Sequence, residues 1–137
     1  MATLTHVSNP VERARIDVAT VTGAKTLTAA DSGIVQVLSA AAGAQIDLPA
    51  LEAGLHFRFI VGDNFATTDW TVVSSTNVIQ GNVDVNNSHV NGSDENTITF
   101  VASAESVGDF VDVVCDGTNW YVSGAANSTG AVTLTQE

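Results

Sequence analysis

The chain has 137 residues, of which 45% are hydrophobic and 14% are charged. This composition suits one folded domain and excludes a disordered or coiled-coil chain. Fifteen acidic residues against four basic ones give a net charge of −11 at pH 7. Because nucleic acids and anionic membranes are bound through Lys and Arg, we expect neither of them as a partner.

The chain also lacks the signals of membrane insertion and export. No run of about 18 apolar residues is present, which predicts that there is no membrane span. The first residues lack the basic and apolar regions of a signal peptide. We therefore expect a protein that is made in a cytoplasm and is not exported by a cleaved signal.

Residues 1–24 are predicted to be an extended N-terminal arm. The first 13 residues show little periodicity, and Asn9-Pro10 is a boundary signal. A partly alternating stretch follows and is broken at Thr22-Gly23. In assembled shells such an arm often crosses onto a neighbouring subunit.

Residues 25–137 are predicted to be one β-sandwich domain. In its first half, a turn at residues 30–33 leads into an aliphatic strand, and a short strand at 45–48 runs into Pro49. Residues 55–61 give the clearest strand, because Leu55, Phe57, Phe59 and Val61 alternate with other side chains and share one face. No window carries a convincing helical face.

The second half continues the pattern with strands at residues 69–74, 97–102 and 131–135 and a hairpin at 108–124. Residues 77–96 are rich in Asn, Asp, Ser and Gly and are predicted to be an excursion loop or a small β-ribbon on the surface. The whole chain gives nine or ten short strands with frequent turns, which indicates an all-β sandwich or barrel. A weak repeat around Gly33 and Gly108 is too short to predict a solenoid.

The hairpin at 108–124 contains a tight-turn signal, Asp116-Gly117, between its two strand patterns. Trp120 and Tyr121 are neighbours on a strand, so their rings must point to opposite faces. We expect one ring in the core and the other covered by a neighbouring subunit or by the 77–96 segment. Cys115 lies in an apolar run and is predicted to be a small buried hydrophobe, not a catalytic thiol.

No arrangement of residues indicates catalysis, and we expect neither an enzyme nor a cofactor. The histidines at 6, 56 and 89 are far apart, and no Gly-x-Ser-x-Gly motif presents a nucleophile. The 91–96 segment gathers oxygen donors, with Asp94 and Glu95 as calcium candidates. Its spacing does not match an EF-hand, and turn chemistry explains these residues equally well.

Several phrases carry a resemblance to a known family. Asp116-Gly117-Thr118-Asn119-Trp120-Tyr121-Val122-Ser123-Gly124 is similar to the terminal hairpin that phage head decoration (cement) proteins share with phage fibre domains. Three upstream phrases occur in the order found in those domains, namely Lys25-Thr26-Leu27-Thr28 with Asp31-Ser32-Gly33, then Ile46-Asp47-Leu48-Pro49, then the strand at 55–61. The resemblance covers about residues 26–124 and is carried by the order of the phrases.

The resemblance implies a jelly-roll-like β-sandwich of antiparallel strands. It also implies a homotrimer that binds the major capsid protein on the outer surface of a phage head and stabilises the shell, so that the protein is located in the virion. The alternative is a tail-fibre or head-fibre tip that binds a host receptor or glycan. The short arm leaves no room for a fibre shaft, which favours the decoration protein. The residues expected to contact the capsid or another subunit are Leu4, His6, Val7, Pro10, Arg13, Arg15, His56 and Arg58.

Overall fold

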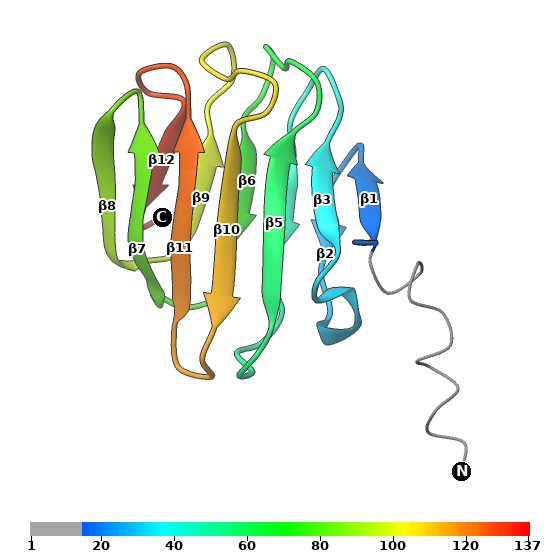
Figure 1. The fold of residues 1–137 in the computed structure, drawn as a ribbon, viewed down its shortest axis with the longest axis vertical. Coiled ribbons are helices and arrows are strands. Elements are labelled where there is room, and N and C mark those ends of the chain that lie inside the picture. The colour runs from blue at the N-terminus through cyan, green and yellow to red at the C-terminus, as the bar shows by residue number, and fades with distance from the viewer. Residues whose placement is uncertain (1–14) are drawn as a thin grey trace.

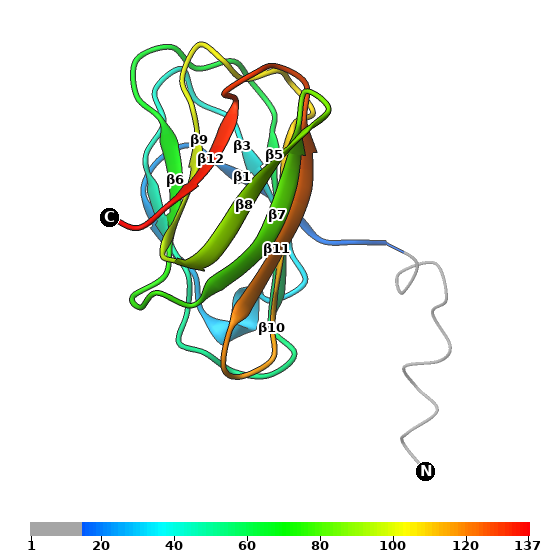
Figure 2. The same ribbon diagram turned by 90° about the vertical axis from the view of Figure 1, so that its left-hand side faces the viewer.

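The computed structural model describes residues 15–137, which form two β-sheets packed face to face (Figures 1 and 2). In spatial order, sheet A contains β1 (Val18–Val21), β3 (Val35–Leu38), β5 (His56–Val61), β10 (Phe110–Cys115), β11 (Trp120–Ala126), β7 (Ile79–Val85) and β8 (Ser88–Glu95). Sheet B contains β12 (Val132–Thr135), β9 (Thr97–Phe100), β6 (Trp70–Val73), β4 (Gln45–Asp47) and β2 (Lys25–Thr26). A short 3-10 turn, η2 (Ala29–Asp31), follows β2.

The predicted all-β sandwich is confirmed, but its strand pairing differs from the prediction. The described residues form 12 strands, not nine or ten, and both sheets are mixed. Strands β1, β3 and β5 run parallel in sheet A, and β2, β4 and β6 run parallel in sheet B. The expectation of antiparallel, jelly-roll-like pairing is therefore wrong for this half of the chain.

The first six strands alternate between the two sheets, so the chain winds like three coils of a solenoid. The weak sequence repeat did not indicate this winding, because successive coils share a path but not a sequence. The later strands close the fold with antiparallel pairs, among them β10 with β5 and β11 and β9 with β6 and β12.

The core lies between the sheets and follows from the alternation of each strand. In β5, Phe57, Phe59 and Val61 are buried, whereas His56 and Arg58 are exposed. In β11 the inward ring is that of Trp120, which is fully buried and lies 6.1 Å from the ring of Phe57. Cys115 is buried as predicted.

The segment at 77–96 forms a hairpin, β7–β8, which is the ribbon alternative of the prediction. Its first strand also runs parallel to β11, so the hairpin extends sheet A. Strand β8 lies beside β12 at this end of the sandwich (Figure 2). Asn96, which follows β8, donates a backbone hydrogen bond to the carbonyl of Thr135. At the opposite end, the edge strands β1 and β2 belong to different sheets and do not pair with each other, and neither has a second neighbouring strand among the described residues.

The predicted arm boundary at residue 24 does not match the start of the sheet. Val18–Val21 is β1, which pairs in parallel with β3, and the next strand begins at Lys25. The alternation at residues 15–21 was the signal for this strand. Among residues 15–137, no helix is long and apolar enough to cross a membrane.

Candidate functional site

The two outer faces of the sandwich differ in chemistry. On sheet B, one row across the strands consists of Gln45, Thr71, Thr99 and Thr133, which are side chains that suit contact with water. On sheet A, apolar side chains occupy many outer positions of β1, β3, β10 and β11, and β5 adds Ile60 beside the polar His56 and Arg58. A sheet with one core face and one solvated face normally alternates apolar with polar side chains, so the outside of sheet A is unusual.

We call this surface the apolar face, and it consists of Ile16, Val18, Val35, Val37, Ile60, Phe110, Val114 and Tyr121. Five large apolar side chains are exposed in the described part of the chain, and four of them belong to it. The exposed fraction is 68% for Ile16, 62% for Val18, 49% for Val114 and 46% for Tyr121. Clustered exposure of this kind marks an interaction surface more often than scattered single residues do.

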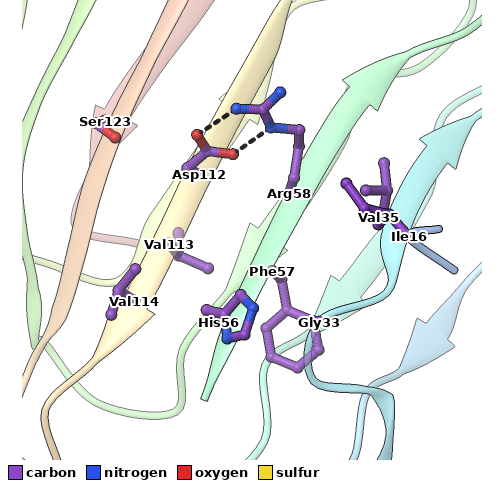
Figure 3. A pocket seen from close by; sticks show the side chains of 10 residues that line it. All are labelled: Ile16, Gly33, Val35, His56, Phe57, Arg58, Asp112, Val113, Val114 and Ser123. Atoms are coloured by element: carbon purple, nitrogen blue, oxygen red, sulfur yellow. Dashed lines mark hydrogen bonds and ion pairs between the residues drawn. The ribbon is translucent and has the colours of Figure 1, made fainter. Parts of the chain in front are cut away.

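An open groove of about 520 Å³ lies in the apolar face (Figure 3). The side chains of Ile16 and Val35 lie on one side of it, and Val114 and Ser123 lie on the other. The groove lies over β3, β5, β10 and β11, which are neighbours in sheet A although they come from distant parts of the chain. Ile16 and Gly33, which precede β1 and β3, complete its lining.

An ion pair forms part of the lining of the groove (Figure 3). Arg58 on β5 donates from Nε to Oδ1 of Asp112 at 2.7 Å and from Nη2 to Oδ2 at 2.9 Å. The guanidinium also lies 4.6 Å from the ring centroid of Phe110. The hydrogen bond and the charge of Asp112 raise the pKa of Arg58 above its ordinary value. The pair is charge-neutral and holds both side chains in a fixed geometry.

Three of the predicted contact residues lie in the described part of the chain. His56 and Arg58 share the outer face of β5 and both line the groove, as their alternation with the core residues predicted. Arg15 is exposed ahead of β1. Leu4, His6, Val7, Pro10 and Arg13 lie outside the described residues.

Sequence reasoning missed most of the apolar face. Val35, Phe110 and Val114 were assigned to strands, but their side of the sheet was not identified. The available signal was in β10, where Val111 and Val113 face the core and the alternate positions are also largely apolar. An apolar strand of this kind is buried on both sides or docks a partner.

The calcium candidates do not form a site with other ligands. Asp94 and Glu95 are the last two residues of β8, and the carboxylate of Asp94 accepts a hydrogen bond from the side chain of Gln80. No group of three or more His, Cys, Asp or Glu side chains that could hold a metal gathers within residues 15–137.

Several carboxylates instead hold loops through backbone hydrogen bonds. Buried Asp109 accepts from the backbone N–H groups of Ser106 at 2.9 Å and Asn127 at 3.0 Å. Asp69 accepts from the backbone N–H of Ala102 at 2.7 Å. Some of the acidic side chains therefore have a structural role, because they hold loops in place.

Asp116 should make the stability of the β10–β11 hairpin pH-dependent. Its carboxylate accepts backbone hydrogen bonds from Asn119 and Thr118, both at 2.8 Å, and one from the Tyr121 hydroxyl at 2.9 Å. These bonds lower the pKa of Asp116 below its ordinary value. The ionised carboxylate therefore stabilises the fold at a pH above the unfolded pKa of about 3.9. This stabilisation is lost as the pH falls through the lower pKa of the folded state.

We expect Asp116→Asn to unfold at a lower urea concentration than the wild type at pH 7, with the difference shrinking below about pH 4. The matched control is Thr118→Ala, which changes the same turn without a titratable group. Its difference from the wild type should stay constant with pH. A constant difference for Asp116→Asn would contradict the stabilising role of the ionised carboxylate.

Comparisons with known proteins identify no relative: no family model, curated protein or solved structure matches the chain.

Proposed function

We propose that this chain is a structural protein of a phage virion that binds the outer surface of the capsid as a homotrimer and stabilises the shell. The observation that carries the assembly part of the proposal is the apolar face, an extended and largely apolar surface on an otherwise acidic sandwich. Such a surface suits binding to another protein. The order of the sequence phrases supplies the class of partner, the major capsid protein.

The stabilising mechanism would be binding linkage. A protein that binds the assembled shell, and not its dissociated subunits, stabilises the shell by a free energy that grows with the ratio of free protein to Kd. This free energy is about 2.7 kcal/mol per site at 100 times Kd. A trimer would join several modest contacts and so gain avidity.

The predicted contact residues divide between two roles in this proposal. The proposed capsid contacts are Leu4, His6, Val7, Pro10, Arg13 and Arg15. Arg13 and Arg15 supply two of the four basic side chains of the chain. His56 and Arg58 line the groove in the apolar face and are assigned to contact with another copy of the chain rather than with the capsid. The remaining acidic surface would repel neighbouring virions.

Undecorated heads of the phage that encodes this chain provide the test. We expect the purified protein to raise the temperature at which these heads lose their shell structure, measured by calorimetry, with the increase saturating as the protein concentration rises. An equal concentration of an unrelated acidic β-protein is the control. No increase at any concentration would contradict the proposal.

A second candidate is a fibre tip that binds a host receptor or glycan. It is favoured by Tyr121, an aromatic side chain that is 46% exposed on the apolar face, because sugar-binding modules usually display exposed aromatics. A glycan array and a cell-adsorption assay would test it. Binding that is lost in Tyr121→Ala would support the fibre tip, and no signal in both assays would exclude it.

A further inference from the structure

The charge pattern of the apolar face limits what can cover it. The chain carries a net charge of −11, so two copies repel each other over most of their surfaces. Within the groove, Arg58 and Asp112 neutralise each other. The centre of this face is therefore locally neutral, and a second copy meets no local charge repulsion there, provided that opposite charges meet across the contact.

The strand register of sheet A brings opposite charges together across the contact when the two copies are related by a two-fold axis. Arg58 and Asp112 are direct cross-strand partners on the adjacent strands β5 and β10. Consider two copies with their apolar faces opposed and a two-fold axis between them, parallel to the strands and midway between β5 and β10. Rotation about this axis places β5 of one copy over β10 of the other, and hence each Arg58 over the Asp112 of the second copy.

The same axis also places apolar side chains of one copy opposite apolar side chains of the other. Ile60 and Phe110 are also cross-strand partners on β5 and β10, so each Ile60 is placed over the Phe110 of the second copy. Both side chains are half-buried in one copy and gain burial in the pair. A surface that is complementary to itself in this way is what an isologous two-fold interface requires.

We propose that two copies of this chain pair through the apolar face around this two-fold axis, with Arg58 and Asp112 of both copies forming a central network of alternating charges. The inference goes beyond the homotrimer proposed above, because a two-fold contact joins copies in pairs and leaves a three-fold contact to other surfaces. Facing sheets cross at about 30°, so the match is closest near the axis.

The size of the face sets the expected affinity. Five strands spaced about 4.8 Å apart and about five residues along each strand give a footprint of roughly 24 by 17 Å. This is roughly 400 Å² of flat area, about half of the surface that each partner buries in a standard interface. We therefore expect a pair with a Kd in the micromolar range, which dissociates on dilution.

Sedimentation velocity tests the pair directly. The native protein is measured from about 1 µM to about 1 mM. We expect its mass to double as the concentration rises, from 14.1 kDa to twice that value for a single chain, or from three to six times that value for the proposed trimer. A protein that remains at 14.1 kDa throughout this range, or that stops at three times that mass, would overturn the two-fold pair.

Charge reversal tests the geometry. Arg58→Asp leaves two carboxylates at the centre of each face and Asp112→Arg leaves two guanidinium groups, so each variant alone should associate at least about 10-fold more weakly. An equimolar mixture of the two variants should pair again, because opposite charges then meet only between different copies. The double variant Arg58→Asp/Asp112→Arg should also pair, and it restores the ion pair within each copy.

A control on the other sheet separates this effect from added charge. Thr99→Asp adds a carboxylate to the outer face of sheet B and should leave the association unchanged. Thermal unfolding of each variant verifies that it is folded. Failure of both the mixture and the double variant to pair would overturn the proposal. Head binding is measured separately, so loss of the pair and loss of the proposed function can be distinguished.

Discussion

Replacement of Trp120 by Ala is expected to lower the free energy of unfolding by about 3–5 kcal/mol. The Trp120 side chain is fully buried between the sheets, and its ring lies against that of Phe57. Removing it leaves a cavity that the surrounding strands cannot fill, because β11 is fixed between β10 and β7. Urea denaturation of the wild type and the variant measures the loss as a lower midpoint.

The matched control is the next residue, Tyr121→Ala, whose ring lies on the outer face and is 46% exposed. It removes one hydroxyl hydrogen bond to Asp116 and should cost about 1 kcal/mol. A larger loss for Tyr121→Ala than for Trp120→Ala would mean that the two faces of β11 are reversed. The apolar face would then belong to the core.

The second large effect is expected for Gly81→Ala, which should lower the free energy of unfolding by about 3 kcal/mol or more. Gly81 lies at an irregularity in the β7–β8 pairing and has a φ of +126°, which an L side chain rarely adopts. An added Cβ would also lie 2.3 Å from the carbonyl oxygen of Val122 on β11. Both backbone strain and a clash with a neighbouring strand therefore oppose the substitution.

Two further glycines separate these causes. Gly108 has a φ of +100° with no heavy atom within 4 Å of an added Cβ, so Gly108→Ala reports backbone strain alone. An added Cβ on Gly124 would lie 2.3 Å from the carbonyl oxygen of Phe110, so Gly124→Ala reports the clash. We expect Gly81→Ala to lower the urea midpoint more than Gly108→Ala does. Equal losses would contradict close packing of β7 on β11.

The local features of the fold could be predicted from the sequence. The alternation at residues 55–61 correctly placed Phe57 and Phe59 in the core and His56 and Arg58 outside, because a strand with one buried face leaves a period of two. Asp116-Gly117 correctly indicated the hairpin turn. Trp120-Tyr121 indicated one inward ring but not which one, because either residue fits a core.

The pairing of distant strands could not be predicted. The parallel contacts of β1 with β3 and of β7 with β11 depend on which strands the core brings together, and local alternation is the same for parallel and antiparallel partners. The apolar face was missed for a related reason. Val114 and Phe110 look like core residues, and only the position of β10 within sheet A shows that they point outward.

Binding to the capsid is the central claim, and counting bound copies tests it most directly. Undecorated heads are mixed with increasing amounts of the protein and sedimented, and the bound protein is quantified per head. The account predicts a plateau at a fixed number of copies that is a multiple of three, because the protein is proposed to bind as a homotrimer. No co-sedimentation, or binding that rises in proportion to concentration without a plateau, would contradict it.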